Sequence, residues 1–338
     1  MEAPLRRGCL GVGRRFALDT LARIGRNGGR SVCSSAVRRH NNPLNLPPRP
    51  APPRQPRTLP DRPPPPPLPR MARGLPVKTP IAGVKHVVAV ASGKGGVGKS
   101  TTAVNLAATL ANHQNLRVGL LDADLFGPSI PLMLNLRGHE PELNDKGMLV
   151  PLVNYGVKAM SMGFLVREED AVVWRGLMVM KALEQLLRQV DWAGTDVLVI
   201  DMPPGTGDTQ LTITQQVPLD GAIIVSTPQD ISLADAKKGV AMFNKVNVPI
   251  LGMVQNMSHH ICTNCGHTSH VFGHGGVKRT AAEMGLPLLG DIPLHSDVCE
   301  TSDVGTPIVV ARPDSEHARV YREMGEKVWA KLSAGKKV

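Results

Sequence analysis

The sequence lacks long apolar runs and has few cysteines. A membrane-spanning helix needs about 18 to 20 consecutive apolar residues, and no window of the 338-residue chain approaches that length. The five cysteines are scattered, and only Cys262 and Cys265 form a CxxC pair. This pattern excludes a secreted, disulfide-stapled domain and favours thiols for metal binding or redox chemistry. We therefore expect at most peripheral association with a membrane.

Lysine is absent from the first 76 residues, and acids are scarce there. This segment holds 15 arginines and three acids, whereas residues 77–338 carry a net charge of −1. The net charge of +11 therefore belongs to the N-terminal segment. Binding to a phosphate backbone needs lysines and arginines clustered on one face. The nearly neutral body gives no reason to expect nucleic acid as a partner.

Composition divides the chain into three segments. Residues 1–40 are rich in arginine, poor in acids and weakly amphipathic, which is typical of a mitochondrial presequence. A disordered basic tail, or translation from upstream of the true start, is the alternative. Residues 41–72 are dense in proline and predict an extended linker. Residues 73–338 predict a folded domain that carries the CxxC pair.

From residue 77 onward, short apolar runs alternate with helix-length segments. This order implies βαβ crossovers and an α/β fold, with a doubly wound, mainly parallel sheet between two layers of helices. The predicted strands cover residues 86–91, 117–122, 157–162, 196–201, 221–226 and 249–254, and the predicted helices cover residues 99–111, 177–190, 233–246 and 319–337.

A glycine-rich loop lies between the first predicted strand and helix. Residues 92–102 read SGKGGVGKSTT and contain the P-loop signature GxxxxGK[ST] in its strand-to-helix context. Lys99 supplies charge to the β- and γ-phosphates of ATP, and Ser100 supplies a hydroxyl for Mg²⁺. Thr101 lies at a helix N-terminus, where the helix dipole favours an anion. Backbone N–H groups that point at the phosphates are assigned to Gly93, Gly95, Gly96, Val97 and Gly98.

A second lysine, Lys94, lies inside this loop, where holding a phosphate does not require it. In this respect the loop resembles the deviant-Walker group of P-loop ATPases, which includes the Mrp-type, MinD, ParA, ArsA and nitrogenase iron proteins. The resemblance implies a nitrogenase-iron-protein-like fold and a homodimer in which Lys94 reaches the partner's nucleotide as a catalytic residue. A lysine that is simply solvated is the alternative.

Two predicted strands end in carboxylates. Residues 197–201 read VLVID, the form of a strand whose terminal acid, Asp201, positions Mg²⁺. Gly205, in the loop that follows, is expected to offer its N–H to the γ-phosphate. The strand at 117–122 ends in Asp122 and is followed by Asp124. By resemblance to the same group, Asp124 orients the attacking water and Asp122 supports the metal, although such aspartates are often only turn formers or helix caps.

The segment at residues 251–257 resembles the base-reading segment of the group, which implies that the amide of Asn256 contacts adenine. An ordinary turn residue after a strand is the alternative.

Further along the sequence, Cys262 and Cys265 have the spacing that lets two thiolates hold one metal from a tight turn. Zinc, a redox dithiol and an iron–sulfur cluster all use such turns; His267 and His270 are the remaining candidate zinc ligands, and His259 and His260 have no assigned role.

From about residue 73 onward the sequence resembles the Mrp-type iron–sulfur carriers. The runs that carry the resemblance are GKGGVGKSTTAVNLA, LLDADLFGPS, MSMGFL, WRGLMVM, LLRQVDW, DMPPGTGD, STPQDI, VQNMS, CTNC and GDIPLH. It extends to the mitochondrial members that assist assembly of respiratory complex I. The resemblance implies delivery of [4Fe-4S] clusters to complex I subunits in the mitochondrial matrix. It also implies weak ATPase activity and a homodimer that bridges the cluster through Cys262 and Cys265, since four thiolates suit such a cluster.

Three other functions compete with the carrier hypothesis. A MinD- or ParA-like partition ATPase has no use for a CxxC pair, although the basic stretch at 319–337 is conceivable as a membrane-surface helix. A zinc-binding P-loop ATPase would use the histidines after the cysteines. An electron-transferring reductase like the nitrogenase iron protein spaces its cluster cysteines far apart, unlike this chain.

Overall fold

The computed structural model describes residues 78–125, 127–165 and 176–335. The expected presequence at 1–40 and the proline-rich linker at 41–72 lie outside these residues, so both remain predictions. The described residues all belong to one compact unit, which spans Pro69–Val338.

Within the described residues, nine strands form a single, mostly parallel sheet, which confirms the predicted fold class. The order across the sheet is β3-β4-β2-β5-β1-β6-β7, and β8 and β9 both pair with β7. Only the β3–β4 and β7–β8 pairs are antiparallel. The strands are β1 (Val84–Ser92), β2 (Val118–Asp122), β3 (Leu152–Asn154), β4 (Val157–Ser161), β5 (Thr195–Asp201), β6 (Gly221–Ser226), β7 (Ile250–Ile261), β8 (Thr268–Ser269) and β9 (Leu288–Leu294).

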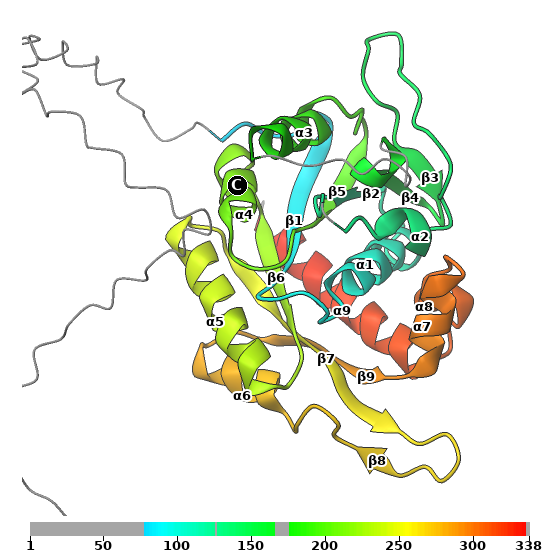
Figure 1. Cartoon of the computed structure of the whole chain (residues 1–338), viewed down its shortest axis with the longest axis vertical. Helices are drawn as coiled ribbons and strands as arrows, with labels where there is room; N and C mark the ends of the chain where they lie inside the picture. The colour runs from blue at the N-terminus through cyan, green and yellow to red at the C-terminus, as the bar shows by residue number, and fades with distance from the viewer. Residues whose placement is uncertain (1–77, 126, 166–175, 336–338) are drawn as a thin grey trace, which may run out of the picture. The chain divides into compact units, whose positions relative to one another are not determined.

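Helices cover both faces of the sheet (Figure 1). One layer contains α1, which packs against α9, α8 and α2, and α7, which packs against α8. The other layer contains α3, α4, α5 and α6, with α5 against β6 and β1. The helices are α1 (Lys99–His113), α2 (Ile130–Met133), α3 (Gly176–Arg188), α4 (Asp208–Gln216), α5 (Asp230–Lys245), α6 (Gly276–Glu283), α7 (Ser296–Asp303), α8 (Ile308–Ala311) and α9 (Glu316–Ala334), and a 3₁₀ turn covers Met162–Phe164.

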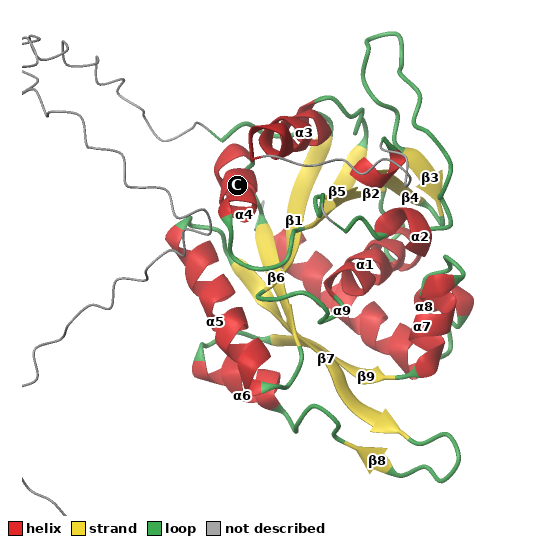
Figure 2. Ribbon diagram, viewed as in Figure 1, coloured by secondary structure: helices red, strands yellow, loops and turns green. Residues whose placement is uncertain are grey.

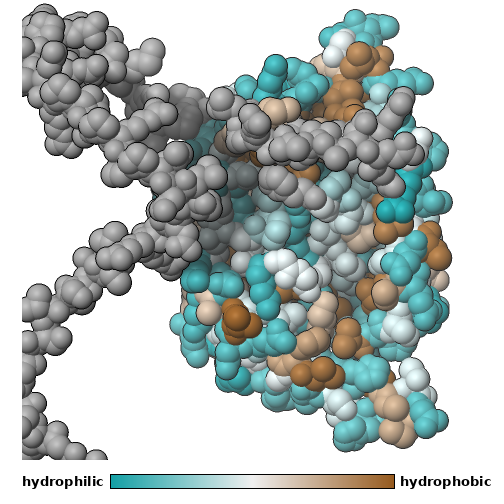
Figure 3. All heavy atoms as spheres, viewed as in Figure 1, coloured by the Kyte–Doolittle hydropathy of each residue, from teal (hydrophilic) through white to brown (hydrophobic). Residues whose placement is uncertain are grey.

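The central strands are buried on both faces, which explains their continuous apolar sequences. Every residue of β2 and β6 is buried, as are the last seven of β1. Parallel strands covered by helices on both sides need such uniform runs of Val, Ile and Leu rather than alternation. On the face shown in Figure 3, the remaining apolar side chains lie in separate patches among polar ones.

The last predicted strand, at 249–254, is much longer than expected. In the structure β7 continues to Ile261 because β6, β9 and β8 supply backbone partners along its length. Its last seven residues read QNMSHHI and are more polar than its first five, but most of these side chains are buried or half-buried. Asn256 therefore lies inside a strand rather than after it, which rules out the alternative of an ordinary turn residue.

The predicted terminal helix at 319–337 corresponds to α9, which packs on α1 and β9 as the last helix of the fold. Its buried residues include Tyr321, Met324 and Val328, so its apolar stripe faces the interior. Among the described residues, no helix combines the length and apolar character that a membrane crossing requires. The smaller elements β3, β8, β9, α2, α4, α6, α7 and α8 were not predicted (Figure 2).

Candidate functional site

The glycine-rich loop connects the C-terminal end of β1 to the start of α1. Gly96 and Gly98 have φ angles of 79° and 82°, a conformation that glycine adopts without strain. Gly98 is the N-cap of α1 and no side chain caps this helix. The first N–H groups of α1 are therefore available to an anion, as the sequence predicts for a phosphate-binding loop.

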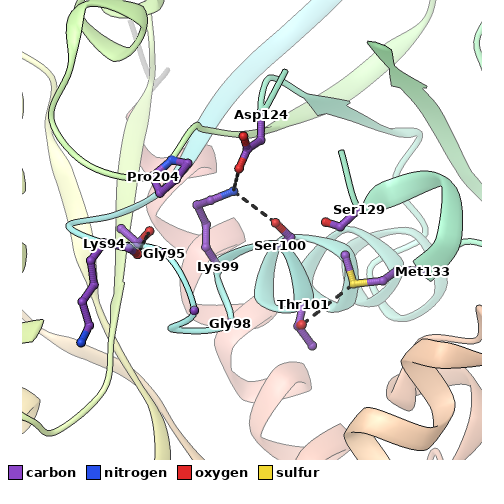
Figure 4. A pocket seen from close by; sticks show the side chains of 12 residues that line it. Lys94, Gly95, Gly98, Lys99, Ser100, Thr101, Asp124, Ser129, Met133 and Pro204 are labelled. Atoms are coloured by element: carbon purple, nitrogen blue, oxygen red, sulfur yellow. Dashed lines mark hydrogen bonds and ion pairs between the residues drawn. The ribbon is translucent and has the colours of Figure 1, made fainter. Parts of the chain in front are cut away.

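A cavity of about 240 Å³ opens over this loop (Figure 4). Among the predicted residues, the cavity is lined by Lys94, Gly95, Gly96, Gly98, Lys99, Ser100, Thr101 and Asp124. Ser92, Ser129, Met133 and Pro204 also line it but were not among the predicted site residues. Ser129 and Met133 belong to a short segment around α2 that has no P-loop signature, so only the fold brings them to the site.

Lys99 lies at the centre of the charged groups. Its Nζ donates to Oδ1 of Asp201 over 2.6 Å and to Oγ of Ser100 over 3.1 Å. The same nitrogen lies 4.0 Å from Oδ2 of Asp124. The pair of Lys99 and Asp201 is almost completely buried, with 6% and 0% of the side chains exposed. The parallel pairing of β1 with β5 places the two motifs side by side, although they are a hundred residues apart in sequence.

The second carboxylate oxygen of Asp201 is buried and has no hydrogen-bond partner. Burial raises the pKa of Asp201, while the neighbouring ammonium of Lys99 opposes that rise. Mg²⁺ is usually held by one or two carboxylates and by water and phosphate oxygens. An unpartnered carboxylate oxygen beside the Ser100 hydroxyl fits this requirement, so the residues present suit the predicted Mg²⁺.

Asp122 does not line the cavity but lies beneath it. Its side chain accepts hydrogen bonds from the N–H of Asp124 (3.1 Å), the N–H of Ile130 (3.4 Å) and the hydroxyl of Ser161 (3.1 Å). Burial, followed by repulsion from Asp201, raises the pKa of Asp122 to about 7. Asp122 therefore fixes the loop that presents Asp124.

The N–H of Gly205 is not free to meet a phosphate. It donates to the carbonyl of Ser92 over 3.0 Å, because Gly205 adopts a φ of 92° that turns the peptide back toward the end of β1. The expected contact of this N–H with a γ-phosphate therefore remains a prediction. Contact with a phosphate would require this hydrogen bond to be exchanged.

The amide of Asn256 contacts the glycine-rich loop itself. Its Nδ2 donates to the carbonyl of Val97 over 2.8 Å, and the residue is 8% exposed. The expected contact with adenine remains a prediction. The position inside β7, next to the loop, is a finding that the sequence did not provide.

Lys94 points away from Lys99 in Figure 4. Its Nζ has a long contact of 3.5 Å with Oε1 of Gln229, the residue before α5. The two lysines of the loop thus face different neighbours. This arrangement agrees with separate roles for them but does not test the predicted contact with a second subunit.

The cysteine pair lies in the turn between β7 and β8, at the end of a hairpin seen at the bottom of Figure 1. Two hydrogen bonds close the turn, from the N–H of Cys262 to the carbonyl of His267 (3.0 Å) and from the N–H of Gly266 to the carbonyl of Cys262 (2.8 Å). Cys265 is exposed and Cys262 partly so. Hydrogen bonds from the backbone N–H groups of Cys265 and Asn264 lower the pKa of Cys262. The turn therefore favours a thiolate, as the CxxC spacing predicts.

The histidines do not complete a metal site with the cysteines. His270 places Nδ1 3.2 Å from the carbonyl of Ser258 and packs against His274, with the ring centroids 4.4 Å apart. Within residues 78–125, 127–165 and 176–335, no three His, Cys, Asp or Glu side chains converge to hold a metal ion. Cys262, Cys265, His267 and His270 thus do not form the compact zinc site left open by the sequence.

Comparisons with known proteins agree with this description. The family model "ParA: NUBPL iron-transfer P-loop NTPase" matches residues 83–329. The iron-sulfur cluster transfer protein NUBPL of Dictyostelium discoideum is 57% identical over 256 residues, which cover 75% of this chain and 79% of that protein. The Arabidopsis thaliana iron-sulfur protein required for NADH dehydrogenase, mitochondrial, is 54% identical over 246 residues, which cover 73% and 78%. A nucleotide-binding protein of Archaeoglobus fulgidus, solved in complex with ADP, is similar with a TM-score of 0.61 at 36% identity and covers 71% of this chain and 93% of its own.

Proposed function

This chain belongs to the NUBPL iron-transfer P-loop NTPases of the ParA family, and from that premise we propose that it carries an iron–sulfur cluster on Cys262 and Cys265 and delivers it under the control of bound ATP. One observation carries the proposal. The two thiols lie in an accessible turn at the end of β7, and the same strand contacts the nucleotide loop through Asn256. Cargo and nucleotide thus share one structural element.

The cargo is a [4Fe-4S] cluster held between two copies of the chain. Such a cluster takes four cysteine thiolates, and each hairpin offers two. Two facing hairpins supply the full set, so the cluster itself bridges a homodimer. In that dimer Lys94, which turns away from Lys99, reaches the nucleotide of the partner subunit.

Bound ATP places its phosphates on the glycine-rich loop and the N-terminus of α1. Lys99 exchanges Asp201 for the β- and γ-phosphate oxygens, and Thr101 lies in the first turn of the same helix. Ser100 and Asp201 hold the predicted Mg²⁺, which neutralises phosphate charge when bound. Asp124, held in place by Asp122, orients the water that attacks the γ-phosphorus. Asn256 contacts the adenine, and Gly205 exchanges its bond to Ser92 for the γ-phosphate.

The recipients are iron–sulfur apoproteins, and specifically subunits of respiratory complex I. Related proteins are named for iron–sulfur cluster transfer and for NADH dehydrogenase in mitochondria. The arginine-rich residues 1–40 have the composition of a mitochondrial presequence. These observations support a location in the mitochondrial matrix.

Anaerobic reconstitution of the full chain with iron and sulfide tests the proposal. We expect about one [4Fe-4S] cluster per two chains, visible as a broad absorption band, together with a shift from monomer to dimer in size-exclusion chromatography. Cys262→Ala abolishes both signals. Cys299→Ala is the matched control, because Cys299 is also an exposed cysteine but lies on α7, outside the hairpin. Stoichiometric zinc without iron in protein purified anaerobically, or a cluster that survives Cys262→Ala, would refute the proposal.

A further inference from the structure

One strand connects the two functional ends of the molecule. β7 places Asn256 against the glycine-rich loop and, after five further residues, leads into Cys262. The contact with the loop is close, because a Cβ built on Gly98 would lie 2.1 Å from Nδ2 of Asn256 and 4.0 Å from Cε of Met257. Asn256 therefore lies against the loop where α1 begins, and the end of the Met257 side chain lies close to the same point.

Met257 has an unusual backbone conformation for its position. Its φ angle is 55°, in the left-handed region that residues other than glycine rarely adopt, and it occurs within a strand. The pairing of β7 with β9 shifts register between Asn256 and His260, so the strand has a bulge at this point. Such strained residues are kept where the surroundings enforce them, and they cluster at functional sites.

The strand is fixed on the sheet side of the bulge. Gln255 is buried, and its amide nitrogen donates to Oδ1 of Asp291 over 2.9 Å. Its amide oxygen accepts from the N–H of Val277 over 3.0 Å. β9 and α6 thus hold Gln255 in place. A displacement of the glycine-rich loop is therefore taken up beyond Gln255, in the direction of the cysteines.

Beyond the bulge, β7 is tied to the other arm of the hairpin. Ser258 is buried and its carbonyl lies 3.2 Å from Nδ1 of His270, which follows β8. His260 and Ile261 pair with Ser269 and Thr268 of β8, and His260 also pairs with Leu294 at the end of β9, where the hairpin leaves the sheet. Both arms therefore move together when the backbone changes at Met257, and the turn with Cys262 and Cys265 moves with them.

We propose that Met257 is a positioning residue whose strained bulge couples nucleotide binding at the glycine-rich loop to the geometry of the Cys262 and Cys265 turn. Phosphate binding repositions Val97 and Gly98, which bear on Asn256 and Met257, and the bulge passes this displacement to the hairpin. The inference rests on the proposed function only in taking these two thiols as the cargo ligands.

The test measures thiol reactivity in the full chain without a cluster. Under anaerobic conditions, the alkylation rate of each cysteine is followed by mass spectrometry with and without a non-hydrolysable ATP analogue and Mg²⁺. We expect the analogue to change the rates at Cys262 and Cys265 by about fivefold or more, the lower range of typical coupling between sites. The rate at Cys299 should not respond to the analogue.

Met257→Gly removes the backbone strain, since glycine adopts positive φ freely. It also removes the Met257 side chain, which ends near Gly98. In this variant the analogue should change the alkylation rates of Cys262 and Cys265 by less than about twofold. The analogue should still bind, because the substitution weakens the coupling between the two sites and leaves the nucleotide site itself intact. Asn247→Gly is the matched control. Asn247 has a φ of 54° and precedes the other end of β7, so the same relief is introduced away from the loop. Its response should stay intact.

A second variant provides the same test if Met257→Gly does not fold. Met257→Asn keeps a side chain that tolerates the left-handed region but lacks the methyl group near Gly98, and it too should weaken the response. The proposal is overturned if the parent chain shows no response to the analogue. It is equally overturned if both folded Met257 variants respond as strongly as the parent. Because no cluster is present, these results are separate from a failure of cluster assembly, which reconstitution reports.

Discussion

The buried carboxylates beneath the cavity should make stability depend on pH in a specific way. Asp122 is 1% exposed, and burial followed by repulsion from Asp201 raises its pKa from 3.8 to about 7. The folded protein therefore holds a proton that the unfolded chain has released over most of this interval. Stability from this group is fully present below pH 3.8 and is lost as the pH rises through about 7.

Replacement of Asp122 by asparagine removes this contribution together with the repulsion that Asp122 exerts on Asp201. The loss amounts to about 1.4 kcal/mol per pH unit inside the window, which gives roughly 2.5 kcal/mol between pH 5 and 7.5. The difference in unfolding free energy, Asp122→Asn minus parent, should therefore rise by about that amount over this range. A constant offset is expected as well, because the amide NH₂ would face one of the three donors that now contact Asp122.

Urea denaturation of the nucleotide-free full chain at several pH values measures this difference. Subtracting the parent's unfolding free energy from the variant's cancels the pH dependence of groups that both proteins share. One such group is His317, whose pKa is lowered by burial. Asp314→Asn is the control, because Asp314 is exposed and its replacement leaves the buried cluster unchanged. A difference for Asp122→Asn that stays flat within about 0.5 kcal/mol, well below the calculated rise, would refute the assigned burial and charge coupling.

Three further outcomes follow from individual residues. Gly93→Ala should lower the unfolding free energy by about 1–3 kcal/mol, because the new Cβ would lie 2.3 Å from the backbone of α5. Gly95→Ala is the control: its Cβ would have nothing within 4 Å, so the thermal midpoint should stay unchanged. At neutral pH, Cys262 should be alkylated faster than Cys299, whose pKa is raised by a carboxylate one turn along α7, and equal rates would contradict this order. Asp124→Asn should lower kcat for ATP hydrolysis by about 10² or more while KM stays similar, and unchanged steady-state kinetics would remove the catalytic role.

The sequence was sufficient where local conformation and function depend on the same few residues. The segment from Gly93 to Thr101 places glycines, a lysine and hydroxyls in one strand–loop–helix unit, so the motif predicts both the turn and its chemistry. The predicted strands that carry Asp122 and Asp201 end at these residues in the structure. Strand ends are predictable here because uniform apolar runs stop where the first carboxylate appears.

The sequence was insufficient where a group's hydrogen-bond partner is distant along the chain. Gly205 donates to Ser92, and Asn256 donates to Val97, across separations of more than a hundred residues. The predicted strand at 249–254 stopped short of the polar second half of β7, because burial by β6 and β9 is a property of the sheet and not of the segment. The local sequence pattern predicts the conformation of a segment, whereas the contacts of Gly205 and Asn256 depend on the order of the strands in the sheet.

The glycines of the P-loop have packing roles besides the phosphate contacts that the motif predicts. All were assigned to the approach of phosphate, yet a Cβ on Gly93 would meet the backbone of α5, and a Cβ on Gly98 would meet Asn256 of β7. Of the four loop glycines, only Gly95 and Gly96 would place a Cβ in open space, and they line the cavity together with Gly98. The loop is therefore packed at both ends against neighbouring elements and open in its middle. A ligand that enters the middle lies between these two tight contacts, and β7 leads from one of them to the cysteines.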